Sequence, residues 1–218
     1  MILGILKYYK GMNILPQVPP EYYRALSYLG ADRWVSYGSQ VRETLRLGPE
    51  RVLEIGIGNG IVRDALKALG VAVTTVDIDP QLRPDIVGSV TALPCQENSF
   101  DLVIAAEVLE HIPYEELAQA LSEIRRVTRR YAYITLPHAG AVIDMTLKLP
   151  LLPRIGVFAK IPFFWKRHIF NGEHYWELGK RGFAVSRITQ AMKTAGFSVV
   201  SSGQDRLNPA HYYFLLQK

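Results

Sequence analysis

The sequence predicts an α/β protein with a doubly wound, mostly parallel sheet and an antiparallel last strand. Short apolar runs alternate with helical patterns from residue 51 to residue 136, and parallel neighbours need such crossovers. The 218 residues, 49% of them hydrophobic, are enough for one sizeable core. The last two strand patterns are joined by a short polar loop without room for a helix, so the final strand should run antiparallel to its neighbour.

Periodicity assigns the elements in chain order. Two helical patterns, 20–30 and 32–48, precede the sheet, and the second has an apolar face through Trp34, Val35, Val41 and Leu45. The strand patterns are 51–56, 71–76, 85–87, 100–106, 131–136, 197–201 and 211–216. The remaining helical patterns are 61–69, 114–127 and 185–195.

We expect a single domain over residues 1–218. It consists of an N-terminal helical segment (1–48), a binding core (49–137), an insertion after the fifth strand (138–182) and a C-terminal helix with the last two strands (183–218). Cys95 is the only cysteine, which excludes a disulfide framework and a zinc site built on several thiolates. No targeting segment or membrane span is evident, and we expect a cytoplasmic protein.

The strongest motif is Glu54-Ile-Gly56-Ile-Gly58-Asn-Gly60, which lies between a strand pattern and a helical pattern. Glycines let the backbone approach a bound nucleoside, and the following helix points unpaired N–H groups at the ligand. Asp77 ends the next strand, where a carboxylate accepts hydrogen bonds from ribose hydroxyls. The pattern predicts a nucleoside-binding loop, and a purely structural turn is the less favoured alternative.

This segment resembles the first motif of class I S-adenosylmethionine-dependent methyltransferases, an acid followed by x-Gly-x-Gly-x-Gly. Four further segments resemble later motifs of that family in the same order: 76–79, 92–94 with 98–101, 107–112 and 195–197. The resemblance implies a Rossmann-like seven-stranded sheet with an antiparallel last strand. It also implies S-adenosylmethionine as cofactor and methyl transfer to an acceptor, which we expect to be a small molecule.

Carried over by position, the resemblance implies the cofactor-binding residues. Asp77 would hold the ribose and Ile78 would pack on the adenine, where Ser89 replaces the acid of many relatives. The full set is Glu54, Gly56, Ile57, Gly58, Asp77, Ile78, Ser89, Val90, Ala106 and Glu107, with the last two beside the sulfonium.

Two other function classes stay open. A nicotinamide-dependent oxidoreductase uses Gly-x-Gly-x-x-Gly, and Ile61 stands where its third glycine would be. A non-catalytic binding module could keep the same fold and an intact loop without turnover. The acceptor and the choice between O-, N- and C-methylation stay open, as does the oligomeric state.

Three histidines are candidate general bases, because imidazole titrates near neutrality. His111 follows the fourth strand and His138 ends the fifth, at the sheet edge where open α/β folds bind ligands; His174 lies in the insertion. The main interpretation assigns no metal ligand. A divalent-metal-assisted O-methyltransferase is kept as a variant that resembles ubiquinone-pathway and small-RNA terminal methyltransferases, with ligands Glu107, Glu110, His111 and His174.

The net charge of +5 comes from one segment, residues 145–172, which contains five cations and no acid. Prolines interrupt this segment, so we expect short helical pieces or a lid over the acceptor pocket, with a packed subdomain as the alternative. Its aromatic and basic residues would also suit a peripheral membrane contact or a lipid-linked substrate. Nucleic acid is disfavoured, because the basic residues form no broad field.

Overall fold

The computed structural model describes residues 16–151 and 155–218. Its main sheet contains β1 (Arg51–Ile55), β2 (Ala72–Asp77), β3 (Ile86–Val87), β4 (Phe100–Ala106), β5 (Thr128–Pro137), β8 (Ser198–Asp205) and β9 (Asn208–Gln217). The α-helices are α2 (Ala31–Leu47), α3 (Ile61–Ala68), α4 (Leu117–Val127) and α5 (Val185–Thr194). Short 3₁₀ turns are η1 (Tyr22–Arg24), η2 (Leu26–Tyr28), η3 (Pro80–Leu82), η4 (Leu109–His111) and η5 (Tyr114–Glu116).

The seven strands lie in the order β3-β2-β1-β4-β5-β9-β8. The pairs from β3 to β5 are parallel, whereas β9 runs antiparallel to both β5 and β8. The predicted fold class is therefore confirmed, including the antiparallel last strand. In a sheet of this order the carboxyl ends of β1, β2 and β4 meet at one edge, where a ligand site is expected.

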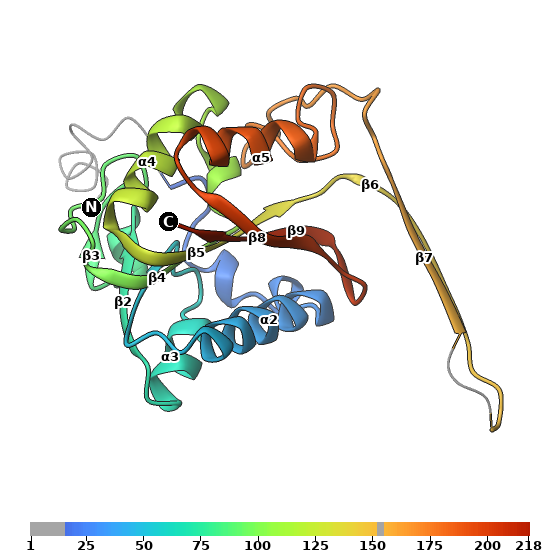
Figure 1. Ribbon diagram of the computed structural model, residues 1–218, viewed down its shortest axis with the longest axis horizontal. Helices are drawn as coiled ribbons and strands as arrows, with labels where there is room; N and C mark the ends of the chain where they lie inside the picture. The colour runs from blue at the N-terminus through green and yellow to red at the C-terminus, as the bar shows by residue number, and fades with distance from the viewer. Residues whose placement is uncertain (1–15, 152–154) are drawn as a thin grey trace.

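Helices cover both faces of the sheet: α2 and α3 lie on one side and α4 and α5 on the other (Figure 1). Successive strand residues alternate between these two layers, as the pleat requires. In β1, Val52 packs with α3 residues such as Leu66, while Leu53 packs with the cluster that holds α4. The sheet is thus buried between two apolar layers, and the loops at the strand ends are anchored to this buried sheet.

The N-terminal helical segment differs from the prediction in two respects. Residues 20–30 form the two short turns η1 and η2 in place of one helix, because Ala25 between them is extended (ψ 140°). In α2, Trp34 and Leu45 of the predicted apolar face are 52% and 45% exposed. The buried positions of α2 are the polar residues Ser36, Gln40 and Thr44.

The insertion after β5 also differs from the prediction. Short helical pieces were expected, but residues 140–147 and 155–162 form β6 (Gly140–Leu147) and β7 (Ile155–Pro162), an antiparallel two-stranded sheet of its own. This arm reaches far out from the body of the molecule (Figure 1). The strands pair from Gly140↔Pro162 to Leu147↔Ile155, which satisfies backbone hydrogen bonds across the arm, and β-branched residues favour this conformation. Pro150 lies beyond the ladder, and Pro153 lies outside the described residues.

Within 16–151 and 155–218, no helix combines the length and the apolar character that crossing a bilayer requires.

Candidate functional site

A cavity of about 390 Å³ opens at the carboxyl ends of β1, β2 and β4. All ten residues that the sequence assigned to the cofactor line it, as do His111 and His174. Eight of the ten cofactor residues lie at or just after the ends of β1, β2 and β4, Ser89 and Val90 follow β3, and His174 comes from the insertion. The cavity therefore gathers these side chains around one space that can hold a small molecule.

The glycine loop is held against the end of β2. Asp77 accepts hydrogen bonds from the backbone N–H groups of Ile57 (2.9 Å) and Asp79 (2.8 Å). Gly56 has φ +78°, and a Cβ at this position would come within 2.5 Å of Val108 Cγ2. The loop needs glycine here for its conformation and for its close contact with the segment after β4.

Two carboxyl groups in the cavity are buried. Burial raises the pKa of Glu54 to about 8, and one of its oxygens, Oε2, has no hydrogen-bond partner among the described residues. Burial also raises the pKa of Asp77 to about 6, although backbone hydrogen bonds oppose the shift. A carboxylate offers about four acceptor sites, so both groups keep acceptor capacity for a ligand that lies in the cavity.

Sequence reasoning missed the wall that the N-terminal segment builds. Tyr22, Tyr23 and Tyr28 pack edge to face with centroid distances of 5.2–5.8 Å, and all three line the cavity. The ring of Tyr23 lies 3.5 Å from the place where a Cβ of Gly58 would be. The sequence does contain a signal for this wall, three tyrosines within seven residues. It was missed because residues 20–30 were interpreted as one helix.

Arg33 of α2 is the only lysine or arginine among the described residues that line the cavity. Its guanidinium stacks 4.0 Å from the centroid of the Tyr28 ring and donates a 3.0 Å hydrogen bond to the Tyr28 hydroxyl. The contact fixes a cation on the cavity wall, where it can bind an anionic group.

Glu107 adopts φ +55°, a left-handed conformation that is strained for a residue with a Cβ. Its Oε1 accepts a 2.8 Å hydrogen bond from the Thr135 hydroxyl, and its Oε2 lies 3.3 Å from His211 Nε2. His211 comes from β9 and also lines the cavity. Sequence reasoning overlooked His211, because nothing local connects it with residues a hundred positions away.

A second cluster gathers Glu110, His111 and His174, whose potential ligand atoms all lie within 4.8 Å of one another. Burial raises the pKa of Glu110 well above its usual value, and neither carboxyl oxygen has a partner among the described residues. Glu107 of the predicted metal set stands outside this cluster. Three of the four residues of the metal variant are thus brought together.

The hydrogen bonds around the two histidines fix their ring orientation. His111 Nδ1 lies 3.0 Å from the Glu173 carbonyl oxygen, which only accepts, and His174 Nδ1 lies 3.1 Å from Glu177 Oε1. Both Nδ1 atoms therefore carry a proton, and the Nε2 lone pair of the neutral His111 ring can accept a hydrogen bond or bind a cation. Burial lowers the pKa of His111 to about 4, which leaves its ring neutral at pH 7.

The structure does not bring His138 to the cavity. Pro137 and His211 form that part of the wall, while His138 is 7% exposed and packs edge to face on Tyr212 with centroids 5.5 Å apart. The strand turns its side chains to alternate faces, so the residue beside Pro137 points into the protein. Its pKa is lowered to about 4, by burial first and then by Lys160.

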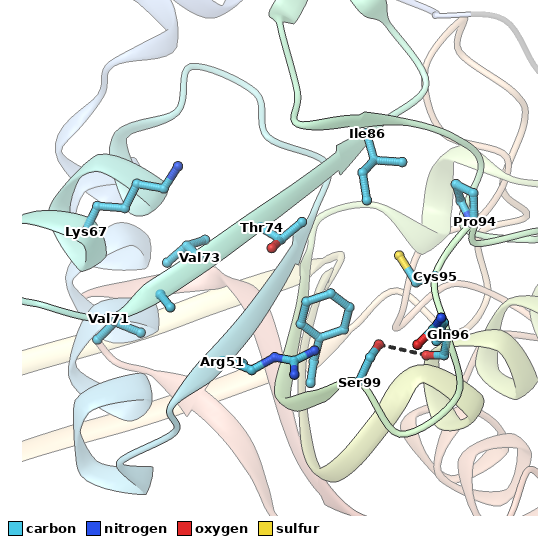
Figure 2. A pocket seen from close by; sticks show the side chains of 12 residues that line it. Arg51, Lys67, Val71, Val73, Thr74, Ile86, Pro94, Cys95, Gln96 and Ser99 are labelled. Atoms are coloured by element: carbon cyan, nitrogen blue, oxygen red, sulfur yellow. Dashed lines mark hydrogen bonds between the residues drawn. The ribbon is translucent and has the colours of Figure 1, made fainter.

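A second hollow, of about 640 Å³, lies around the start of β1 and β2 (Figure 2). It is larger and more open than the cavity described above, and its wall includes Arg51, Lys67 and Cys95. No carboxylate or histidine of the described residues lines it, and it lies away from the carboxyl ends of the strands. The smaller cavity is therefore the candidate functional site.

Comparison with known proteins agrees with this geometry. Residues 53–136 match the family described as "Methyltransferase domain". The matched segment begins in β1 and ends in β5, so it carries most of the cavity lining that follows these strands. The family recognised from the motifs is thereby confirmed over these residues.

Characterised relatives match part of the chain. A ubiquinone biosynthesis O-methyltransferase from Xanthomonas euvesicatoria pv. vesicatoria is 34% identical over 34% of this chain and 37% of the relative. One from Nitrosococcus oceani is 27% identical over 52% of this chain and 57% of the relative. The chain thus spans just over a third to just over half the length of these curated relatives.

Solved structures show the same fold over nearly the whole chain. The 1,6-didemethyltoxoflavin-N1-methyltransferase of Burkholderia thailandensis, with bound 1,6-didemethyltoxoflavin and S-adenosylhomocysteine, has a TM-score of 0.56 at 17% identity, covering 94% of this chain and 92% of that one. The magnesium protoporphyrin IX methyltransferase of Synechocystis PCC 6803, with bound S-adenosylhomocysteine, has a TM-score of 0.59 at 15% identity, covering 86% and 84%. These likenesses establish the fold.

Proposed function

We propose that this chain, whose residues 53–136 belong to the methyltransferase domain family, is an S-adenosylmethionine-dependent methyltransferase. The observation that carries the proposal is the clamp between the glycine loop and Asp77, at the edge of the sheet where the family match lies. The acceptor is proposed to be a small molecule, because the cavity is enclosed by side chains of several segments. A cytoplasmic location belongs to the proposal and is supported by the free thiol of Cys95.

The residues of the cavity fit the proposed cofactor. Asp77 keeps acceptor capacity for two ribose hydroxyls. Gly56 and Gly58 line the cavity without side chains, so the backbone of the loop can come close to the ligand. Glu54 offers a buried oxygen without a partner to the ammonium end of the methionine portion, directly or through water. Arg33 offers a cation to the carboxylate of the methionine portion.

When bound, S-adenosylmethionine supplies an electrophilic methyl group on a sulfonium sulfur. The task of the protein is to hold the acceptor in line with that group and to exclude water. The three tyrosines of the N-terminal segment serve both purposes, because they cover the glycine loop with aromatic rings. Neutral His111 accepts a proton or a hydrogen bond from the acceptor through its free Nε2.

Binding of S-adenosylhomocysteine tests the proposal at its first step. Isothermal titration calorimetry should show binding to the full chain and none of NADH under the same conditions. Binding of NADH without S-adenosylhomocysteine would favour the nicotinamide-dependent alternative and overturn the proposal. Tritium transfer from methyl-labelled cofactor into extract, followed by mass spectrometry of the product, then identifies the acceptor and separates an enzyme from a binding module.

The cluster of Glu110, His111 and His174 favours a second candidate, the divalent-metal-assisted variant. A carboxylate and two imidazole nitrogens are a common ligand set for zinc and related ions. Histidines that bind a metal usually donate their other ring N–H to a carboxylate, as His174 Nδ1 does to Glu177. Equilibrium dialysis with Zn²⁺ and with Mg²⁺ tests this variant. His174→Ala should abolish binding while His211→Ala, a cavity residue outside the cluster, should not; equal retention of the ion by both variants would remove the metal from the mechanism.

A further inference from the structure

The arm formed by β6 and β7 has two chemically different faces. In an antiparallel pair, residues directly opposite each other lie on the same face, and successive residues alternate. The register pairs Leu147 with Ile155 and Met145 with Val157. It therefore assembles one face entirely from apolar residues, which we call the apolar arm face: Ala141, Ile143, Met145, Leu147, Ile155, Val157, Ala159 and Ile161.

The apolar arm face is open to solvent, whereas the opposite face is in contact with the body. Met145, Ile155 and Val157 are 65%, 59% and 56% exposed. On the other face, Arg206 from the turn between β8 and β9 binds Asp144 (2.8 Å) and the Thr146 hydroxyl (2.6 Å). The contact with Arg206 fixes the direction in which the arm turns its apolar side.

The size of this surface sets it apart from scattered exposed residues. Eight residues per strand span about 27 Å at the usual rise of an antiparallel strand. Figure 1 shows the outer part of the arm projecting beyond the main sheet and the α-helices. A contiguous apolar strip of this length marks a surface that binds something, because soluble monomers seldom expose one.

The charge around the strip selects an anionic occupant. Asp144 is paired with Arg206, and the sequence from 145 to 172 then contains five cations and no acid. Lys148, beyond the end of β6, and Lys166 and Arg167, beyond the end of β7, are exposed. A second copy of the chain would bring the same excess of positive charge to the contact, which disfavours self-association.

Aromatic side chains continue the surface at the base of the arm. Phe164 and Trp165 follow β7 and are 67% and 53% exposed, and Phe170 is 49% exposed. Exposed phenylalanine and tryptophan beside lysine and arginine are typical of residues that lie at the boundary between lipid headgroups and acyl chains.

We propose that the arm binds the surface of an anionic lipid bilayer, with the apolar arm face against the acyl boundary and the lysines among the headgroups. The ribbon lies along the surface and does not span the bilayer, because the outer edges of β6 and β7 have unpaired backbone groups that need water. The inference goes beyond the proposed methyl transfer, since it uses no residue of the cavity.

Vesicle co-sedimentation of the full chain tests the proposal. The protein should bind vesicles that contain phosphatidylglycerol and should bind pure phosphatidylcholine vesicles far less, with binding that falls as salt rises. The variant Met145→Ser/Val157→Ser, on the apolar arm face, should lower the bound fraction by about tenfold or more. Lys148→Gln should weaken binding to anionic vesicles by a smaller factor.

Val142→Ser is the matched control, because Val142 is 40% exposed but lies on the opposite face of the same strand. It should bind like the parent chain, and unchanged thermal unfolding confirms that each variant is folded. Absence of binding to any vesicle would overturn the proposal, as would equal binding by the double variant. Concentration-dependent self-association without lipid, lost in the double variant, would assign the face to a second copy and also overturn it. Calorimetry with S-adenosylhomocysteine tests the proposed function separately. Binding of this ligand without binding to vesicles would overturn only the role of the arm.

Discussion

The cavity has two walls of different origin. The motif wall consists of cavity residues at and after the ends of four strands: 54–59 at β1, 77–79 at β2, 88–90 after β3, and 106–108 with 111 at β4. The assembled wall consists of Tyr22, Tyr23, Tyr28, Arg33, Glu173, His174 and His211, which come from both ends of the chain. The motif wall binds through backbone and carboxylate groups, and the assembled wall adds aromatic rings, a guanidinium and imidazoles.

The two walls should differ in how far a substitution that weakens binding also lowers the stability of the fold. In the motif wall, a side chain such as Asp77 also holds the backbone, so loss of its function and loss of stability come together. In the assembled wall, the described hydrogen bond of Arg33 reaches a side-chain group, the Tyr28 hydroxyl, and holds no backbone segment in place. Substitutions there should change binding with little change in stability, and four substitutions test this comparison.

Gly56→Ala should give the largest effect. A Cβ at φ +78° is strained and would meet Val108 Cγ2 at 2.5 Å, so the free energy of unfolding should fall by about 3 kcal/mol. Gly38→Ala in α2, with no atom within 4 Å, should raise it by about 0.5–1 kcal/mol. Urea unfolding measures both, and equal effects would contradict the conformational account of the loop.

Asp77→Ala should weaken binding of S-adenosylhomocysteine by about 1.5–3 kcal/mol, because charge-assisted hydrogen bonds to the ribose are lost. Calorimetry measures the affinity, with Asp64→Ala on the surface of α3 as the control. The variant should also unfold more easily, because Ile57 and Asp79 lose their acceptor. Unchanged affinity in Asp77→Ala would place the ribose elsewhere.

Glu54 predicts a pH dependence of stability. Its folded pKa of about 8 lies above the ordinary value of 4.5 for a glutamate, so the folded state holds the proton more tightly and stability falls as pH rises between the two values. The low pKa of His111 has the opposite effect below pH 6.5, its ordinary value, so the interval from about pH 6.5 to 8 isolates the carboxyls.

Over that interval the parent chain should lose on the order of 2 kcal/mol through Glu54. Glu110, also with a raised pKa, contributes in the same direction and is present in both proteins. Glu54→Gln should therefore have a flatter profile of unfolding free energy against pH than the parent. Parallel profiles would mean that Glu54 stays ionised in the folded protein.

Arg33→Gln should give the smallest effect, a loss of about 1 kcal/mol in affinity for S-adenosylhomocysteine with unchanged unfolding. Arg24→Gln, in the exposed turn η1, is the control and should bind normally. If Arg33→Gln lost as much stability as affinity, the assembled wall would behave like the motif wall, and the proposed difference between them would be wrong.

His111→Ala adds a kinetic test once an acceptor is identified. If His111 accepts a proton from the acceptor, turnover should fall by about 10²-fold or more while cofactor affinity stays the same. The affinity is expected to persist because the described hydrogen bonds of the ring reach Gln17 and Glu173, neither of which holds the glycine loop or Asp77. Unaltered turnover would assign His111 to packing.

The sequence by itself determined the sheet and the motif wall, because both follow from local patterns. Apolar runs between helical patterns give β1 to β5, and a loop after a strand end must lie beside the loop of its neighbour. For the same reason the glycine loop and Asp77 were found without knowledge of distances, and the glycines indicated a close approach of the backbone. The role of Glu107 came from the family resemblance of residues 107–112.

Only the tertiary structure decided the assembled wall and the arm. His211 reaches Glu107 because β9 returns beside β5, a pairing that no local pattern encodes, while His138 turns away from the same edge. The sequence predicted an apolar face of α2 that includes Trp34, and a lid or a packed subdomain for the insertion. Trp34 and Met145 are nevertheless exposed, because burial depends on whether another element covers a face. The periodicity of the sequence shows which face of a helix or strand is apolar, but only the tertiary structure shows whether another element packs against that face.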